Sequence, residues 1–357
     1  PERPRLPVAL QHPGGHGPAA DADRQPAALV HTGGPPALGQ RRPLLRPLER
    51  LRAPLVLQER RSVRSGGGPP AEVLSGLTSV AGVAGGPRQV ARSLSPAIHN
   101  AGYRALGLDW VYVGFPVAAE GADAVAVLRG LGGSGVAGFN VTMPHKLAAA
   151  EAVDRLAGEA AVVGAVNAVE VAGSELVGWN TDGEGLASFL VRETDTDLDG
   201  CSLVVIGAGG SARSVVSGLV LAGAGSVTVL ARDPDRAASL APMAGKGLFR
   251  ALPLEAPASA DAVGSADVIV NATPVGQEGE APLIPVGAIR RGAVVVDLVY
   301  HPLETPLVQA ASRAGARAYG GLGMLVHQAA LAFEIFTGRT APLEAMWAGA
   351  REALTRP

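Results

Sequence analysis

The chain has 357 residues, of which 47% are hydrophobic and 17% charged, and its formal net charge is -2 at pH 7. This length allows two domains of ordinary size, and the charge balance does not indicate a basic nucleic-acid surface or an acidic tail. The single cysteine, Cys201, excludes an intrachain disulfide, and we interpret it as a small core residue. The longest uncharged run, residues 214–231, is broken by glycine and serine and does not predict a membrane span. We expect a cytoplasmic protein without a signal peptide.

Residues 1–75 differ in composition from the rest of the chain. The first 70 residues hold thirteen of the 28 prolines and eleven arginines but no Phe, Tyr or Trp. A segment with so few large apolar side chains cannot bury enough surface to offset the entropy lost on ordering, so we predict a disordered extension. Because the first methionine is Met143, we also hypothesise that this segment is non-native upstream sequence, which abundant natural peptides from it would refute. A nucleic-acid-binding arm is the alternative, but the segment lacks aromatic residues for base stacking.

From residue 79 a regular alternation of strand and helix patterns begins. Strands are predicted at residues 80–84, 110–115, 136–141, 163–171 and 175–179, the last two as a hairpin, with helices at 97–106, 122–131 and 146–157. Short connections between such elements predict a mainly parallel sheet covered on both faces. We place this first α/β domain at residues 76–182.

A second alternating unit follows a linking helix and turn at residues 183–199. Its strands are predicted at residues 202–206, 226–230, 268–271, 293–297 and, more briefly, 316–318. This pattern is typical of a doubly wound, Rossmann-type domain, which we place at residues 183–320. Residues 321–336 and 342–354 then predict two helices that pack back on the cleft between the domains.

A glycine-rich turn lies between the first strand of this second unit and the helix that follows. Gly207 permits a tight turn, Gly209 lets the backbone approach a pyrophosphate, and Ala212 allows close packing of helix on strand. With Gly210 and Ser211 between them, these residues predict a dinucleotide-binding site at a helix N-terminus. A glycine turn without a ligand is the alternative.

The end of the next strand indicates which dinucleotide binds. NAD-binding units usually carry an acidic residue there, whereas this chain has Ala231. Arg232 and Arg236 follow, and two guanidinium groups suit a ribose 2′-phosphate, so NADP is predicted. Asp233 and Asp235 offer the alternative that the arginines simply pair with them.

Polar side chains gather at the end of the strand predicted at residues 136–141. Asn140 and Thr142 can bind hydroxyl groups, and Lys146 begins the next helix at the sheet edge where α/β proteins bind ligands. The chain has only two lysines, Lys146 and Lys246, and an ammonium can donate a proton where a guanidinium cannot. These features favour a chemical role for Lys146 over that of a solvated surface group.

Several motifs together resemble the shikimate dehydrogenase family in order along the chain. They occupy residues 93–100, 138–146, 164–168, 180–183, 207–212, 271–273, 297–300 and 320–328. The resemblance implies reversible, NADP-dependent reduction of 3-dehydroshikimate to shikimate in a cleft between an N-terminal substrate domain and a C-terminal Rossmann-type domain. It also implies roles for particular residues: catalysis by Lys146 and Asp182; carboxylate binding by Ser93, Ser95 and Tyr300; hydroxyl binding by Asn140, Thr142, Asn167 and Gln328; and further cofactor contacts at Thr273, Val299, Gly321 and Met324.

Some of these residues have simpler alternative roles. Asp182 can hold the Lys146 ammonium beside a developing oxyanion, but it also stands where an N-cap residue is expected. Ser93 and Ser95 are expected on one side of an extended segment. Met324 has core packing as its alternative. We interpret His99 as structural and predict no metal site, because His145 and His327 lack partners at ligand spacing.

Two features depart from the family pattern. Arg92 stands where the family usually has histidine, in a loop two residues longer than usual, and Asp233 replaces a small hydroxyl residue. The competing functions are a quinate/shikimate dehydrogenase with relaxed use of NAD, and a non-catalytic nucleotide-binding regulatory protein. We expect a monomer or homodimer whose partners are small molecules.

Overall fold

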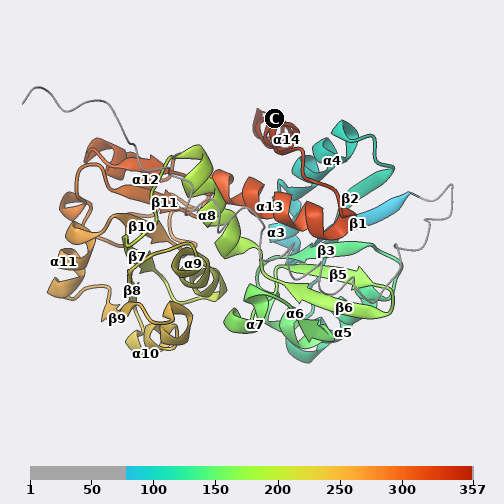
Figure 1. Cartoon of the computed structure of the whole chain (residues 1–357), viewed down its shortest axis with the longest axis horizontal. Coiled ribbons are helices and arrows are strands. Elements are labelled where there is room, and N and C mark those ends of the chain that lie inside the picture. Colours follow the sequence, from blue (N-terminus) through green and yellow to red (C-terminus); the bar gives the residue numbers. More distant parts are fainter. Residues whose placement is uncertain (1–77, 356–357) are drawn as a thin grey trace, which may run out of the picture. The chain divides into compact units, whose positions relative to one another are not determined.

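The strands of the computed structural model, which describes residues 78–355, form two six-stranded sheets (Figure 1). The first sheet has the order β2-β1-β3-β5-β6-β4. Its strands are β1 (Ser79–Gly85), β2 (Trp110–Pro116), β3 (Gly138–Val141), β4 (Arg155–Leu156), β5 (Ala168–Ala172) and β6 (Glu175–Trp179). The strands β2, β1 and β3 run parallel, whereas β5 is antiparallel to both β3 and β6. The predicted hairpin is therefore confirmed.

Helices cover both faces of the first sheet. They are α3 (Pro87–Ala91), α4 (Ser95–Ala105), α5 (Gly121–Gly132), α6 (Lys146–Ala152) and α7 (Glu159–Val163). Val83 packs in one core cluster with Ile98 of α4, and Ala84, its neighbour on β1, packs in another with Leu128 of α5. Successive side chains of a strand point to opposite faces, so both faces of the sheet are buried, as predicted.

Two predicted elements of this part have the wrong extent. The helix predicted at residues 146–157 ends at Ala152, because Val153 is extended and β4 follows. The strand predicted at residues 163–171 begins only at Ala168, as β5, and Val163 is instead the last residue of a short helix, α7. Gly164 ends α7 in the left-handed conformation with φ of 65°. A short apolar run fits a buried helical turn and a buried strand equally well, which explains the error.

The second sheet is parallel throughout, with the order β12-β11-β10-β7-β8-β9. Its strands are β7 (Ser202–Ile206), β8 (Ser226–Ala231), β9 (Leu248–Pro253), β10 (Val268–Asn271), β11 (Val294–Asp297) and β12 (Arg317–Tyr319). The strand order reverses between β7 and β10, as a doubly wound sheet requires. The sequence pattern did not predict β9, an edge strand that holds Arg250 and ends in a proline.

The helices of the second half complete this fold. They are α8 (Asp182–Glu193), α9 (Gly210–Leu221), α10 (Pro234–Ala238), α11 (Pro257–Ser265), α12 (Pro306–Arg313), α13 (Leu322–Thr337) and α14 (Leu343–Thr355), with 3-10 turns at Ala241–Ala244 and Val286–Ala288. Cys201 is buried in the core around β7, as predicted.

Glycines let α8 pass very close to two other helices. A Cβ atom on Gly218 of α9 would lie 2.2 Å from the carbonyl carbon of Gly183. A Cβ atom on Gly185 would lie 2.7 Å from the backbone nitrogen of Gln328 on α13. Real Cβ atoms do not approach other atoms this closely, so only glycine permits these crossings. The crossings fix the start of α8, and therefore Asp182, beside Gln328.

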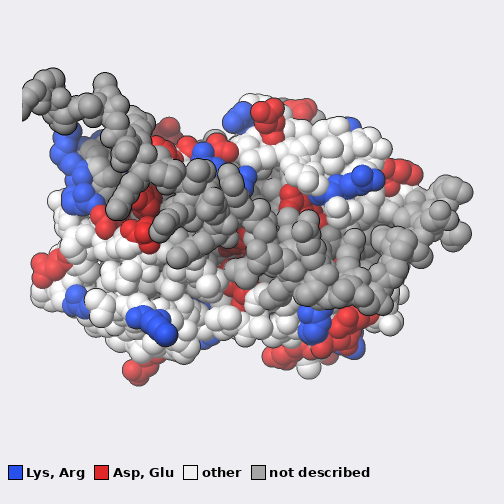
Figure 2. Space-filling model, in the orientation of Figure 1, with Lys and Arg blue, Asp and Glu red and all other residues white. Residues whose placement is uncertain are grey.

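The described surface carries both signs of charge. On the face drawn in Figure 2, acidic and basic side chains appear in small groups separated by uncharged surface. Within residues 78–355 no helix is long and apolar enough to cross a membrane. The disordered extension predicted at residues 1–75 lies outside the described residues.

Candidate active site

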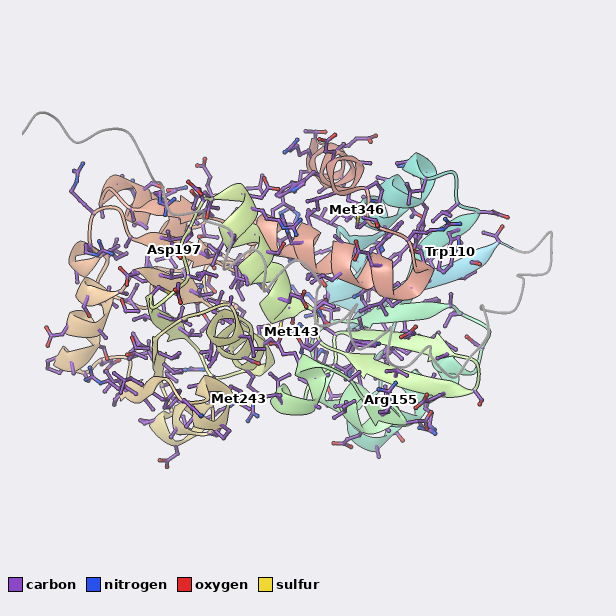
Figure 3. The ribbon with its side chains drawn as sticks, viewed as in Figure 1. Trp110, Met143, Arg155, Asp197, Met243 and Met346 are labelled. Atoms are coloured by element: carbon purple, nitrogen blue, oxygen red, sulfur yellow. The ribbon has the colours of Figure 1, made fainter. Side chains whose placement is uncertain are left out.

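A pocket of about 380 Å³ lies at the carboxyl ends of β1 and β3 and is also lined by loops that follow β10 and β11. All nine residues predicted to act in catalysis or substrate binding line it: Ser93, Ser95, Asn140, Thr142, Lys146, Asn167, Asp182, Tyr300 and Gln328. Met143, labelled in Figure 3, is an exposed residue on its wall. The structure therefore brings together side chains that are up to 235 residues apart in the chain, from Ser93 to Gln328.

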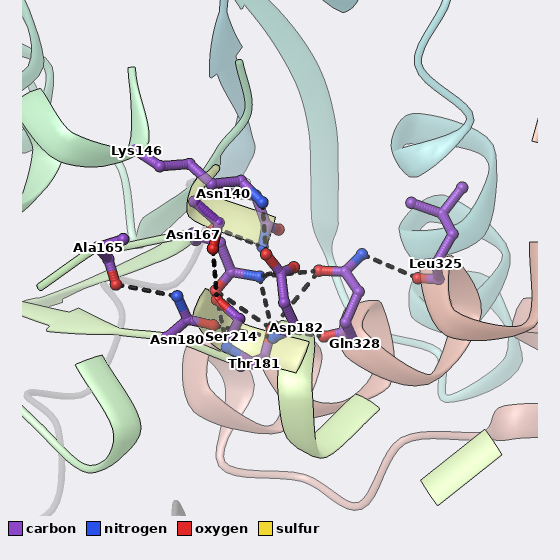
Figure 4. Close-up of polar contacts among 11 residues, drawn as sticks. Asn140, Lys146, Ala165, Asn167, Asn180, Thr181, Asp182, Ser214, Leu325 and Gln328 are labelled. Carbon is purple, nitrogen blue, oxygen red and sulfur yellow. Dashed lines mark hydrogen bonds and ion pairs between the residues drawn. The ribbon is translucent and has the colours of Figure 1, made fainter. Parts of the chain in front are cut away.

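An ion pair between Lys146 and Asp182 stands at the centre of these residues (Figure 4). The Lys146 ammonium contacts Asp182 Oδ2, and the side chains are only 16% and 6% exposed. Lys146 begins α6, directly after the turn that follows β3, and Asp182 begins α8. The pair therefore offers a proton donor at the pocket wall together with a carboxylate that holds it in place.

Asn167 and Thr181 fix the orientation of Asp182. The Asn167 amide nitrogen donates to Asp182 Oδ1 at 2.7 Å, while Asn167 Oδ1 accepts from the Thr181 backbone N–H at 2.8 Å. The Thr181 hydroxyl donates to the Gln328 carbonyl at 3.1 Å, which ties the network to α13. Because the Asp182 carboxylate is engaged by Lys146 and Asn167, and no side chain caps α8, the capping alternative for Asp182 is wrong.

The two serines do not lie on an extended segment, which corrects the prediction. Leu94 between them is helical, with φ of -83° and ψ of -9°, and α4 begins at Ser95. The Ser95 backbone N–H donates to the Ser93 hydroxyl oxygen at 3.2 Å. Such a turn at a helix start is a common use of serine, and it leaves both residues on the pocket wall. The positive end of the α4 dipole therefore favours binding of an anion beside the two serine hydroxyl groups.

The glycine turn after β7 has the shape that a pyrophosphate requires. Gly207 has φ of 105°, and a Cβ atom there would meet the Thr273 methyl group at 2.8 Å. Beside Gly209 and Gly210 there is open space within 4 Å of an added Cβ atom, and α9 begins at Gly210 without a side-chain cap. Ala212 is fully buried against the sheet. These features fit a dinucleotide phosphate at the N-terminus of α9.

Two arginines follow the end of β8. Arg232 and Arg236 are exposed, and neither forms an ion pair with a described residue. Asp233 instead caps α10, because its carboxylate accepts from the backbone N–H groups of Asp235 and Arg236 at 3.1 Å each. Among the described residues the predicted alternative, pairing with Asp233 or Asp235, is therefore absent, and the residues present fit NADP.

The remaining predicted cofactor residues divide into two groups. Ser211, Thr273, Val299, Gly321 and Met324 line the pocket, and Met324 is also buried in the core around β7. The second group does not line the pocket and lies on two segments: the turn after β7 with the start of α9 (Gly207, Gly209, Gly210 and Ala212), and the segment that leads from β8 into α10 (Arg232 and Arg236). Since β7 and β8 are neighbours, these two segments follow adjacent strands.

A buried carboxylate holds the loops that carry Thr273 and Val299. Asp297 is fully buried and accepts from the Asn271 amide at 2.9 Å, the Val299 backbone N–H at 3.1 Å and the Thr305 hydroxyl at 2.6 Å. Asn271 Oδ1 in turn accepts from the Thr273 hydroxyl at 2.7 Å. One connected network therefore sets both loops at the pocket.

Two further carboxyl groups, unrecognised in the sequence, lie near Asp182. Burial, followed by the charges of Glu184 and Asp182, raises the pKa of Glu159 well above its usual range. Burial, with the charge of Glu334, raises the pKa of Glu184 to about 7. Both groups therefore tend to hold a proton at pH values where ordinary carboxyl groups are charged.

Sequence reasoning missed several other residues of the site. Thr181 belongs to the motif at residues 180–183, which was a usable signal. Tyr112 donates a hydrogen bond from its hydroxyl to Asn140 at 2.7 Å. The sequence held no signal for this contact, because the two residues are 28 positions apart. The pocket wall also includes Arg88, Gln89, Gln277, Glu278 and His301, together with Arg92, which the sequence had already drawn attention to.

Two of the histidines considered in the sequence, His99 and His145, are buried among other protein groups. His99 is fully buried against Tyr112, and burial lowers its pKa to about 3. A ring nitrogen of His145 lies 3.0 Å from the Val117 carbonyl oxygen. Within residues 78–355, no group of three or more His, Cys, Asp or Glu side chains is arranged to hold a metal ion.

Comparison with known proteins identifies related sequences over most of the described chain. Three family models match: "Shikimate dehydrogenase substrate binding domain" at residues 85–169, "Shikimate / quinate 5-dehydrogenase" at 190–292 and "Shikimate 5'-dehydrogenase C-terminal domain" at 321–349. A protein of Geobacter sp. (strain M21) named shikimate dehydrogenase (NADP(+)) is 45% identical over 274 residues, which cover 75% of this chain and 93% of that protein.

Solved structures share the fold. Shikimate 5-dehydrogenase from Thermus thermophilus, in complex with NADP(H) and shikimate, is 35% identical with a TM-score of 0.69, covering 77% of this chain and 99% of that one. Quinate dehydrogenase from Corynebacterium glutamicum, in complex with NAD, is 29% identical with a TM-score of 0.70 over 77% and 99% of the two chains. The predicted α/β fold, with an N-terminal substrate domain and a C-terminal nucleotide-binding domain, is confirmed. The chain belongs to the shikimate dehydrogenase family.

Proposed function

We propose that this protein catalyses the reversible reduction of 3-dehydroshikimate to shikimate with NADPH, a step of aromatic amino acid biosynthesis. The observation that carries the proposal is the largely buried Lys146–Asp182 ion pair, which lies on a pocket that is also lined by serines, amides and the loops of the nucleotide-binding sheet. A non-catalytic binding protein has no need of a desolvated proton donor at this position.

The pair supplies the proton chemistry of the reaction. NADPH, when bound, supplies the hydride to the carbonyl carbon. Lys146 Nζ donates a proton to the carbonyl oxygen, so that the oxyanion never accumulates, and in the reverse direction it accepts the hydroxyl proton. Asp182 holds the ammonium at the pocket wall and accepts from a neighbouring hydroxyl of the substrate. Asn167 and Thr181 keep the Asp182 carboxylate turned toward Lys146.

The other end of the pocket suits the substrate carboxylate. Ser93 and Ser95 present hydroxyl groups at the start of α4, where the helix dipole favours an anion, and Tyr300 lies on the same pocket. Burial raises the pKa of Tyr300, so its hydroxyl remains a hydrogen-bond donor. Asn140, Thr142, Asn167 and Gln328 bind the ring hydroxyls. Such uncharged groups select strongly, because a wrong ligand leaves them unpaired.

NADP is the proposed cofactor. Gly207, Gly209, Gly210, Ser211 and Ala212 form the turn that receives its pyrophosphate. Arg232 and Arg236 bind the 2′-phosphate, which their exposure and lack of ion pairs to described residues support. Thr273, Val299, Gly321 and Met324 line the pocket, and we propose that they contact the nicotinamide.

We propose a domain division at residues 76–182, 183–320 and 321–357. The first boundary falls at the first residue of α8, Asp182.

We also propose a cytoplasmic monomer or homodimer whose partners are small molecules and not nucleic acids. Light scattering of the purified protein tests the oligomeric state, and a mass above two chains would refute it.

A spectrophotometric assay tests the function. Turnover is measured with shikimate and NADP, shikimate and NAD, and quinate and NADP. The proposal predicts that the first combination has by far the highest kcat/KM. Equal use of quinate or NAD would identify the broader quinate/shikimate activity instead, and no turnover with any combination would contradict an enzymatic role.

A further inference from the structure

The orientation of the Asn140 amide in the pocket is set by hydrogen bonds on both of its polar atoms. It lies on β3, all of whose residues are buried, and its amide nitrogen donates to the Asn167 carbonyl at 3.0 Å. On its other side, Asn140 Oδ1 accepts from the Tyr112 hydroxyl at 2.7 Å. With one N–H and one oxygen lone pair thus engaged, Asn140 presents one further N–H and one further lone pair to the pocket.

Tyr112 is itself rigidly held, although it does not line the pocket. Its side chain is 2% exposed, and its ring stacks on His99 with centroids 4.1 Å apart and planes at 9°. Its backbone exchanges two hydrogen bonds of 2.9 Å with the Asn100 side chain. Burial raises the pKa of Tyr112 well above its usual range, so the hydroxyl keeps the proton that it donates.

We propose that Tyr112 is a positioning residue that acts on the substrate through Asn140. Its hydroxyl holds the Asn140 amide in the orientation that binds a ring hydroxyl of the substrate. This role rests on the shikimate dehydrogenase activity proposed above. Without that hydroxyl, the buried Asn140 Oδ1 loses a partner, and the amide gains freedom to tilt away from the productive geometry. The backbone and the aromatic stack remain in place, so the effect falls on substrate binding.

The test is a double-mutant cycle of Tyr112→Phe and Asn140→Ala. Loss of one buried neutral hydrogen bond predicts that Tyr112→Phe raises KM for shikimate about three- to tenfold, with kcat changed less than about twofold. In the Asn140→Ala background the same change is expected to alter KM less than about twofold, because its target is gone. An equal effect in both backgrounds, or an unchanged KM in the single variant, overturns the proposal.

Tyr103→Phe is the matched control. Tyr103 is 1% exposed and belongs to the same aromatic group around His99, but its hydroxyl has no hydrogen-bond partner among the described residues. We expect its removal to leave KM unchanged. An increase equal to that of Tyr112→Phe would show that any buried tyrosine hydroxyl has this effect and would overturn the proposal.

A structural readout separates this proposal from the proposed function. Crystal structures of the wild type and Tyr112→Phe are expected to differ in the Asn140 amide, which turns or spreads over two orientations. One unchanged orientation in both overturns the positioning role. If the wild type does not turn over shikimate at all, the proposed function fails, and this comparison still decides whether Tyr112 positions Asn140.

Discussion

Replacing Lys146 by methionine separates the stability of the central ion pair from its chemistry. Lys146→Met removes the ammonium but retains a chain of similar length, and it leaves the Asp182 carboxylate, 6% exposed, with Asn167 as its remaining side-chain partner. Removing one partner of a buried pair costs about 3–5 kcal/mol. Because Lys146 is 16% exposed and Asp182 keeps a hydrogen bond, we expect about 3 kcal/mol, the lower end of that range.

The double variant Lys146→Met/Asp182→Asn tests this reasoning. It has no unpaired charge, so its stability is expected to return to within about 1 kcal/mol of the wild type. Thermal unfolding without ligands is the measurement, and the single variant should melt about 6 °C below the wild type. Turnover should not recover: both variants are expected to lose about 100- to 10,000-fold in kcat, because neither has the proton donor.

Two results would refute this account. A double variant as unstable as Lys146→Met would show that the charge of Asp182 is not what destabilises the single variant. Near-normal turnover of Lys146→Met would show that another group supplies the proton. Asp182→Asn alone controls for the loss of the carboxylate charge.

Three further predictions concern the cofactor, the substrate and pH. Arg232→Ala should weaken NADP binding about 10- to 100-fold and leave NAD binding unchanged, and equal weakening of both in a titration would contradict the 2′-phosphate assignment. Arg92→Ala removes an exposed guanidinium beside Ser93 and should raise the KM for shikimate about three- to tenfold, with a smaller increase at high salt. Arg104→Ala, on α4 outside the pocket wall, is the control and should leave this KM unchanged. Folding raises the pKa of Glu184 from 4.5 to about 7, so the folded protein binds this proton more tightly than the unfolded chain. The protonated Glu184 side chain therefore contributes its full stabilisation below about pH 4.5, and this stabilisation is lost as the pH rises through 7. Urea denaturation should therefore show a smaller loss of stability over this interval for Glu184→Gln, and an unchanged loss would refute the assignment.

Groups of residues near one another in the sequence were recognisable as candidate sites. The roles proposed for the glycine turn at 207–212 and for the residues that follow Ala231 depend on the backbone conformation and charge of a few adjacent positions, so their pattern is visible in the sequence. Lys146 was recognisable because it follows a strand end and is one of two lysines. The structure places Lys146 on the pocket wall, and it places the glycine turn and the two arginines after the neighbouring strands β7 and β8.

Features that depend on distant contacts were not predictable. The Tyr112–Asn140 hydrogen bond joins positions 28 residues apart, and the network from Asn167 to Gln328 spans 161. The raised pKa values of Glu159 and Glu184 arise from helices that meet only in the fold. The geometry of Ser93 and Ser95 was predicted wrongly because the same spacing of two fits both a strand and the start of a helix.

The central claim is that Lys146 and Asp182 act directly on the substrate at the group that is oxidised. A crystal structure of the protein with shikimate and NADP tests it most directly. We predict that Lys146 Nζ lies about 2.6–3.2 Å from the hydroxyl oxygen that loses its hydrogen, on the side opposite Ser93 and Ser95. A complex in which bound shikimate presents that hydroxyl to other groups, with Lys146 turned to solvent, would contradict the account.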